Sequence, residues 1–394
     1  MTLAHIAGFP IISGLLLALA DIAGAAPAGD AGKYILTPKP GPLPRINGPS
    51  VYGARPGRPF LYRIPATGDR PVRFSAHGMP ASLRLDPATG IVSGATPGKA
   101  GESLLTLRAW NSHGAATRYF KIVVGDTLAL TPPMGWNDWY THYDRVTADL
   151  IRRAASSMVS SGMADFGYQY VNIDDWWMVK PGYTDPDLGG EPRGADGSIR
   201  PNGRFPDMKG LTTFIHSYGL KAGIYSSPGP LTCAQFAGSY GHEEADARKF
   251  AEWGFDFLKY DWCSYGRVAS GTNAQDRKRP YELMGSILAQ LDRGIVFNLC
   301  QYGMDEVWKW VAPWAATAGA PRATSAWKRT HAFPAFTPLR SKTPSTPNTP
   351  VPATGTTPIT FSSARWARLT APGTRSSPPR SPRTSNTATC RCGL

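Results

Sequence analysis

The stretch from residue 128 to residue 310 alternates short apolar runs with amphipathic segments, and this alternation limits the possible folds most strongly. The runs are apolar on both faces, as strands are when helices cover both sides of a parallel sheet. The segments between them repeat hydrophobic residues at helical spacing. We expect strands in the segments 132–139, 168–178, 221–227, 255–263 and 294–303. We expect helices in the segments 147–163, 211–220, 242–254 and 281–291, and one more from residue 305.

Strands that alternate with helices predict a parallel (β/α)8 TIM barrel, and residues 128–312 would supply about five of its βα units. The alternative is a doubly wound open sheet, which usually has a glycine-rich phosphate loop after its first strand. The sequence MGWNDWY at that place is not such a loop. In a barrel the C-terminal ends of the strands meet at one face, so functional residues are expected there.

Residues 34–126 differ from this segment, because short strand-like runs are separated by turn signals. The run LRLDPATGIVSG, for example, predicts a strand, a turn and a second strand. Strands at this spacing are typical of an all-β sandwich. Together with the later LRAWNSHG, the pattern resembles the Ig-like modules found beside exported bacterial enzymes.

The formal charge of +14 on 394 residues is concentrated at one end of the chain. Residues 307–394 contain twelve Lys and Arg and no Asp or Glu, which leaves 30 of the 42 basic residues against 28 acidic ones before them. The first 306 residues are therefore nearly neutral. The basic tail has few aromatic residues, so nucleic acid is not an expected partner. A membrane is not expected either, because no stretch after the N-terminal one is long and apolar enough to span a bilayer.

The first 25 residues are typical of a signal peptide. The apolar core FPIISGLLLALADIAGAAPAG runs into Ala23-Gly24-Ala25, an A-x-A-type cleavage site. A membrane-spanning helix is the alternative, but Asp21 and the small residues make the apolar stretch too short. We therefore expect a secreted or periplasmic protein, in which a disulfide is plausible.

Polar and aromatic side chains gather at the C-terminal ends of the expected strands. They are Trp136, Asp138, Asp174, Asp175, Trp176, Tyr225, Lys259, Asp261 and Gln301. Carboxylates and an ammonium bind hydroxyl groups through charge-assisted hydrogen bonds, and aromatic faces bind the C–H face of a sugar ring. The sequence has no phosphate loop, no G-x-S-x-G motif and no histidine cluster of metal spacing. We therefore expect a sugar site that needs neither a metal nor another cofactor.

Each of these residues also has a structural interpretation. Asp174 and Asp175 could cap the loop that follows them. Lys259 and Asp261 are two residues apart on one face of a strand and could form an ion pair. The tryptophans could belong to the core. Two tandem aspartates before aromatic residues nevertheless favour a functional role.

Several motifs, in a fixed order, resemble glycoside hydrolase family 27, the family of α-galactosidases. They are PPMGWNDW, YVNIDDWWM, AGIYSSPGPLTCAQFAGSYGHEEADARKFAEWGFDFLKYDWC and NLCQYGMDEVWKW. The resemblance runs from about Leu130 to Trp310. It implies a retaining hydrolase that releases terminal α-D-galactosyl residues from oligosaccharides or galactosides through a covalent glycosyl-enzyme intermediate.

The resemblance also assigns roles to individual residues. The aspartate of the family's K-Y-D-x-C motif is the nucleophile, which corresponds to Asp261. The family's pattern further implies a disulfide between Cys233 and Cys263. The residues that it places around the sugar are Trp136, Asp174, Asp175, Tyr225 and Lys259.

Two departures from the family pattern concern the site. Trp176 stands where the family often has a cysteine, so a second disulfide is not expected. Cys300-Gln301-Tyr302 stands where many members have Cys-Glu-Trp, at a position that helps recognise the 2-substituent of the sugar. The alternatives are therefore an α-N-acetylgalactosaminidase, a β-L-arabinopyranosidase or a sugar-binding protein without catalysis.

The family keeps its acid/base on the sixth strand, in a motif like CWRTTGD, and this chain has no acidic residue after Glu306. We interpret residues 313–394 as an out-of-frame or disordered basic tail. Read with the codon boundaries shifted by one base, AATAGAPRATSAWK can encode GHCWRTTGDLGLE, and ATGTTPITFSSA can encode HWNDPDYILIG. Both re-read segments match family motifs in the right order. The acid/base is accordingly expected to be absent from this chain, and the chain as written is expected to fold poorly and to be inactive.

Overall fold

The computed structural model describes residues 39–310, and its N-terminal part consists of strands. They are β1 (Arg45–Ile46), β2 (Val51–Ala54), β3 (Pro59–Arg63), β4 (Ala66–Thr67), β5 (Arg73–His77), β6 (Leu83–Leu85), β7 (Ile91–Ala95), β8 (Gly101–Asn111) and β9 (Gly114–Val124). Three sheets result, with the strand orders β2-β9-β8-β5, β3-β7-β6 and β1-β4. Only β2 and β9 pair in parallel within this part. The predicted all-β module is thus confirmed.

The turn between β6 and β7 shows how local sequence forms this module. The Asp86 carboxylate accepts the Ala88 N–H at 2.8 Å, which closes the turn that the motif LDPATG predicts. Gly90 then has a φ of +73°. A Cβ at Gly90 would lie 3.0 Å from the Phe74 ring, so both the backbone and the packing favour glycine.

The second part contains a five-stranded sheet whose strands all run in parallel. Its strands are β10 (Gly135–Asn137), β11 (Tyr170–Asn172), β12 (Lys221–Ser226), β13 (Phe257–Asp261) and β14 (Val296–Cys300). Their order in the sheet is their order in the chain. This arrangement is that of part of a (β/α) barrel, as the alternation of strands and helices predicts.

Helices connect these strands, and several of them begin at a residue that caps the first turn. The α-helices are α2 (Trp139–His142), α3 (Ala148–Ser160), α4 (Met208–Ser217), α5 (Glu243–Trp253) and α6 (Ala274–Gln290). The 3-10 helices are η1 (Tyr143–Arg145), η2 (Met163–Phe166), η3 (Tyr265–Arg267) and η4 (Met304–Lys309). Thr147, Asp207 and Asn273 accept backbone N–H groups in the first turns of α3, α4 and α6. Such caps satisfy donors that a helix cannot pair internally.

The hydrophobic core of this part lies between the sheet and its helices. α3 packs against α4, α4 against α5, and α5 against α6. Ile224 of β12 and Leu258 of β13 are fully buried, as are Ile151 of α3 and Phe250 of α5. Strands buried on both faces explain why their sequences are apolar throughout.

The strand expected over 168–178 is shorter than the sequence predicts, because β11 ends at Asn172. Beyond that point side chains take over the backbone hydrogen bonding. The Asp138 carboxylate accepts the Asp174 N–H, and the Asp174 and Asp175 carboxylates accept the N–H of the next residue. Such local side-chain bonds compete with a sheet ladder and turn the chain away from the sheet.

Two helix predictions also need correction. The helix expected over 281–291 begins already at Ala274, because Asn273 caps it and Pro280 is accommodated inside it. The helix expected from residue 305 is the 3-10 segment η4, in which Asp305 and Glu306 have positive φ angles. A left-handed backbone at two consecutive residues is incompatible with an α-helix.

Two of the sequence predictions fall on residues that the structure does not describe. The signal peptide of residues 1–25 and the tail of residues 313–394 both lie outside residues 39–310. Within that described range, no helix combines the length and the apolar character that crossing a membrane would require.

Truncation of a core side chain on α5 should destabilise the barrel part strongly. Phe250 is fully buried, with its ring centroid 6.0 Å from that of Trp177. We expect Phe250→Ala to lower the free energy of unfolding by about 3–5 kcal/mol, because it leaves a cavity. Leu283→Ala on α6 is the control, since Leu283 is 44% exposed and should cost less than about 1 kcal/mol. Urea denaturation followed by tryptophan fluorescence measures both, and equal losses would contradict the assigned core.

Candidate active site

The parallel register places the predicted polar residues at one edge of the sheet. Tyr225 of β12 pairs with Lys259 of β13, and Asp261 at the end of β13 pairs with Cys300 of β14. Asp174 follows β11 at the same edge. Because neighbouring parallel strands end together, side chains that are far apart in sequence become neighbours here.

A buried ion pair forms the centre of the site. The Lys259 ammonium donates to Asp174 Oδ2 at 2.7 Å, and Asn137 Nδ2 donates to the same oxygen at 2.7 Å. The Lys259 ammonium also lies 5.1 Å from the centroid of the Tyr225 ring. Removing one member of such a pair would leave a buried charge without compensation.

Two further aspartates are completely buried beside this pair. Asp138 Oδ1 accepts the Asp174 N–H at 2.7 Å, and burial together with the nearby Asp174 charge raises the pKa of Asp138. Asp175 accepts the backbone N–H of Trp176 and, at 2.9 Å, that of Ala234. Burial raises the pKa of Asp175 to about 7, although these N–H donors favour the ionised form. Burial thus works against the ionisation of both Asp138 and Asp175.

The Asp261 carboxylate is held by two tyrosine hydroxyls. Tyr302 donates to Oδ1 at 2.7 Å, and Tyr225 donates to Oδ2 at 3.3 Å. Burial raises the pKa of Asp261, whereas the Lys259 ammonium and the two hydroxyls oppose that rise. The Lys259 ammonium, two residues before Asp261, pairs with Asp174 Oδ2 at 2.7 Å.

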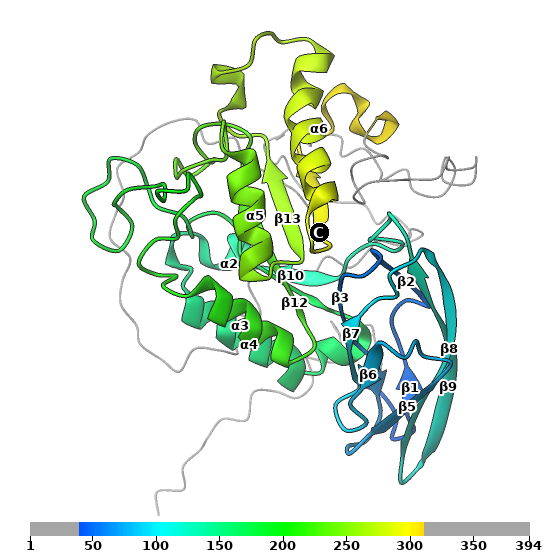
Figure 1. Ribbon diagram of the computed structural model, residues 1–394. Helices are drawn as coiled ribbons and strands as arrows, with labels where there is room; N and C mark the ends of the chain where they lie inside the picture. The colour runs from blue at the N-terminus through cyan, green and yellow to red at the C-terminus, as the bar shows by residue number, and fades with distance from the viewer. Residues whose placement is uncertain (1–38, 311–394) are drawn as a thin grey trace, which may run out of the picture. The chain divides into compact units, whose positions relative to one another are not determined.

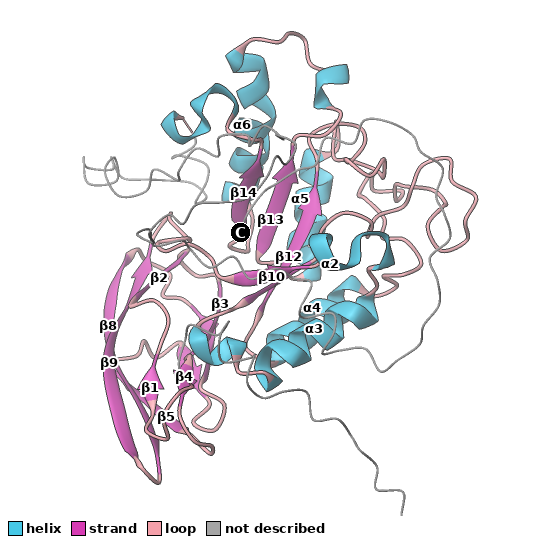
Figure 2. Ribbon diagram, turned by 180° about the vertical axis from the view of Figure 1, so that it is seen from behind, coloured by secondary structure: helices cyan, strands magenta, loops and turns pink. Residues whose placement is uncertain are grey.

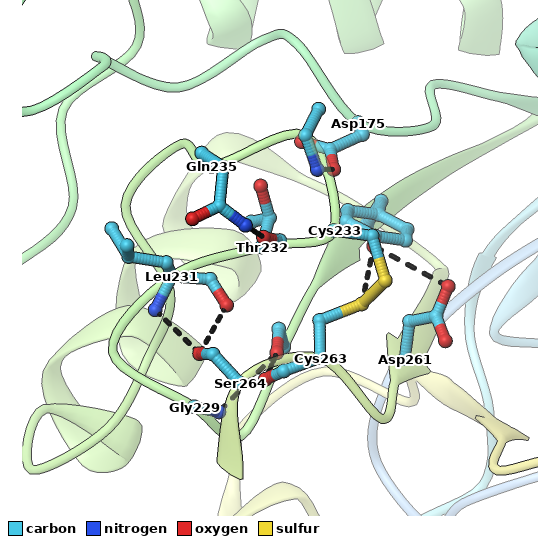
Figure 3. The surroundings of a disulfide bond; sticks show 12 residues. Asp175, Gly229, Leu231, Thr232, Cys233, Gln235, Asp261, Cys263 and Ser264 are labelled. Atoms are coloured by element: carbon cyan, nitrogen blue, oxygen red, sulfur yellow. Dashed lines mark hydrogen bonds between the residues drawn. A yellow bond between two sulfur atoms is a disulfide. The ribbon is translucent and has the colours of Figure 1, made fainter. Parts of the chain in front are cut away.

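A disulfide lies directly beside Asp261. Cys233 and Cys263 are joined next to Asp261, as the sequence resemblance implies (Figure 3), and their Cα atoms lie 5.0 Å apart. The Tyr225 hydroxyl lies 3.5 Å from Cys263 Sγ. Ser264 exchanges hydrogen bonds with both backbone groups of Leu231. The loops after β12 and β13 are thus linked by a covalent bond and by hydrogen bonds.

The remaining predicted residues flank this group. Trp136 is half-buried in β10, and Gln301 is buried directly after β14. Among residues 39–310, Trp136 Nε1 and Gln301 Oε1 are buried without a hydrogen-bond partner. Buried polar atoms normally have partners, so a ligand that supplies them would satisfy both atoms.

The possible metal-ligating atoms in this region do not make a metal site. Over residues 39–310, the one such group of three side chains is Cys233, Asp261 and Cys263. The two sulfur atoms are bonded to each other and offer no thiolate. Asp261 alone remains as an ionisable ligand, which does not suffice for a metal.

The structure adds two residues that the sequence analysis did not assign to the site. Asn137 contacts Asp174, and Tyr302 contacts Asp261. Asn137 lies between Trp136 and Asp138 in the first motif, and Tyr302 directly follows Gln301. The only signal in the sequence was that both residues are adjacent to assigned ones. The register of the sheet decides which of these adjacent residues reach the site.

A parallel sheet with carboxylates, an ammonium and aromatic rings at its C-terminal edge is the arrangement of a (β/α)-barrel enzyme. Comparisons with known proteins show which class of enzyme this part of the chain is similar to. Residues 131–317 match the family model "Alpha galactosidase A", and residues 43–125 match the model "Putative Ig domain". Residues 131–317 are therefore similar to the α-galactosidases of glycoside hydrolase family 27, and residues 43–125 to Ig-like domains.

Individual relatives agree with this assignment. "Alpha-galactosidase 2" of Arabidopsis thaliana is 40% identical over 202 residues, which are 50% of this chain and 46% of that protein. "Alpha-galactosidase A" of Cellvibrio japonicus is 40% identical over 188 residues, which are 47% of this chain and 42% of that protein. The chain thus spans about half the length of the curated relatives that it matches.

A solved structure covers more of the chain. A crystal structure from Bacteroides fragilis, described as a putative α-galactosidase/melibiase, has a TM-score of 0.62 at 42% identity. The likeness covers 68% of this chain and 55% of that one.

The buried carboxyl of Asp175 should give the folded protein a distinct pH dependence. Its pKa is raised in the folded state, so its contribution is complete below the unfolded pKa of 3.8 and is lost as the pH rises through about 7. Asp175→Asn cannot titrate. We expect the stability of the unmodified protein to fall relative to Asp175→Asn between pH 4 and pH 8, by about 4 kcal/mol at most.

Urea denaturation at each pH measures this difference. Asp187→Asn serves as the control, since Asp187 is an exposed aspartate. A constant difference between the Asp175 variant and the unmodified protein would show that Asp175 does not titrate in this range.

Proposed function

We propose that this domain is the nucleophile-bearing half of a retaining α-galactosidase. The observation that carries the proposal is the buried Asp261 carboxylate at the end of β13, held by two tyrosine hydroxyls next to the Lys259–Asp174 pair. The match of residues 131–317 to α-galactosidases supports the choice of reaction. The substrate would be a terminal α-D-galactosyl residue of an oligosaccharide or a simpler glycoside.

Each group has a role in binding or attack. Lys259, Asp174 and Asp175 bind the hydroxyl groups of the sugar, and the Trp136 ring covers its apolar face. The indole N–H of Trp136 and the side-chain oxygen of Gln301 meet polar groups of the ligand. In the first step, an Asp261 oxygen forms a bond to the anomeric carbon. The bond from that carbon to the leaving oxygen breaks, and its electron pair departs with the oxygen.

The leaving oxygen normally needs a proton, which a second carboxyl group must donate. A retaining enzyme carries a second carboxyl about 5–5.5 Å from the nucleophile to supply that proton. The sequence has no Asp or Glu after Glu306, where the family places this residue. The shortened family match, which ends at residue 317, supports a shift of the reading frame near Trp310 to Trp314.

The proposal extends to the remaining predictions. Residues 1–25 would direct a secreted or periplasmic protein, residues 34–126 would form the Ig-like module, and residues 128–312 the catalytic part. An α-N-acetylgalactosaminidase or a β-L-arabinopyranosidase would use the same mechanism with another sugar. Comparison of aryl glycosides of the three sugars separates these activities.

A substrate whose leaving group needs no proton tests the proposed function in the full chain as it exists. With dinitrophenyl α-D-galactoside, we expect a burst of up to one equivalent of dinitrophenolate and a protein mass increased by one hexosyl group. The glycosyl-enzyme should persist, because no base activates water. Rapid-mixing absorbance and intact mass spectrometry measure both.

Asp261→Asn is the control and should lower the rate of the burst by about 10⁴-fold. Binding of galactose without any burst would instead favour a sugar-binding protein. A chain with the frame restored near codon 312 should also hydrolyse galactosides with poor leaving groups, about 10²–10⁴-fold faster than the chain as written. Equal rates for the two chains would place the proton donor before Val307.

A further inference from the structure

Tyr302 occupies an unusual position for a residue that contacts the candidate nucleophile. It follows β14 by two residues and has a φ of +62°, in the left-handed region that bulky residues rarely adopt. Its side chain is 51% exposed, yet its hydroxyl donates to Asp261 Oδ1 at 2.7 Å. The strained backbone thus directs a ring from the outer side of the site onto the carboxylate.

The two tyrosines approach Asp261 from opposite neighbours of β13. Tyr225 belongs to β12 and is almost completely buried, whereas Tyr302 follows β14. Their hydroxyls donate to different oxygens of the same carboxylate, at 3.3 Å and 2.7 Å. Two donors on different oxygens fix the rotation of the carboxylate plane, which a single donor would leave free. The shorter bond, from Tyr302, is the stronger of the two.

We propose that Tyr302 is a positioning residue of the Asp261 nucleophile, which it holds in its attacking orientation and in its ionised form together with Tyr225. The inference rests on the proposed function for the meaning of attack, and on geometry for the contact itself. A side chain that only filled space would need no hydroxyl at this point.

The charges around Asp261 explain why such a donor matters. Burial raises the pKa of Asp261, and so does Asp174, after β11. Lys259 on the same strand lowers it, as do Tyr302 after β14 and Tyr225 on β12. The two hydroxyls therefore add to the stabilisation that the Lys259 ammonium gives the buried Asp261 carboxylate.

The first experiment measures the ionisation of Asp261 without any need for activity. The full chain is labelled with ¹³C at the aspartate carboxyl groups, and the Asp261 resonance is assigned by its loss in Asp261→Asn. In Tyr302→Phe, which keeps the ring and the backbone, we expect the titration midpoint of Asp261 to rise by about one pH unit. Tyr119→Phe on β9, where Tyr119 is 69% exposed, should leave the midpoint unchanged.

The second experiment follows the burst with dinitrophenyl α-D-galactoside as a function of pH. The acidic limb of the rate should move upward in Tyr302→Phe by the same interval as the Asp261 midpoint. A midpoint and a limb that both coincide with those of the unmodified chain would overturn the proposal. If the unmodified chain gives no burst, the proposed function fails, while the carboxyl titration still decides whether Tyr302 holds Asp261.

Discussion

The burial of four carboxyl groups around one ammonium is the constraint on which the site depends. Asp138, Asp174, Asp175 and Asp261 are each at most 2% exposed, and Lys259 pairs directly with Asp174. One ammonium cannot pair with four buried carboxyl groups, and an unpaired buried carboxylate is costly. Neutral groups therefore donate hydrogen bonds to the other carboxyl groups. Backbone N–H groups donate to Asp175, and tyrosine hydroxyls donate to Asp261. Hydrogen bonding to these carboxyl groups therefore determines the local path of the chain as much as hydrophobic packing does.

The sequence predicted the strands and helices well where apolar residues recur with a regular period. Strands with two apolar faces and helices with one are visible residue by residue, so β12, β13 and α3 lie close to their expected limits. The prediction failed where side chains compete with backbone pairing, as in the early end of β11 after Asn172. The composition of the site followed from the ends of strands, but Tyr302 could not be assigned, because its role depends on a left-handed backbone angle that the sequence does not reveal.

The two edges of the five-stranded parallel sheet show that the described strands form part of a barrel and not a closed one. Among the described strands of this sheet, β10 and β14 have one neighbour each and so lie at its two edges. In a closed barrel these edges would be paired by further strands. The matched stretch covers about half of the curated relatives, and under the proposed function its residues would bind the sugar and supply the nucleophile.

The Cys233–Cys263 disulfide beside the site can form only where the chain is made under oxidising conditions. Cys233 is exposed, whereas Cys263 is buried two residues from Asp261, so a reductant in the surroundings can reach one end of a bond whose other end lies beside that carboxyl group. The two cysteines lie on successive β/α units, which means that oxidation can link the two loops only after both units have been made. Chains produced in a reducing cytosol would carry Asp261 and its neighbours and still lack this link. Recombinant yield would then be a poor measure of functional protein, and the oxidation state of the preparation a better one.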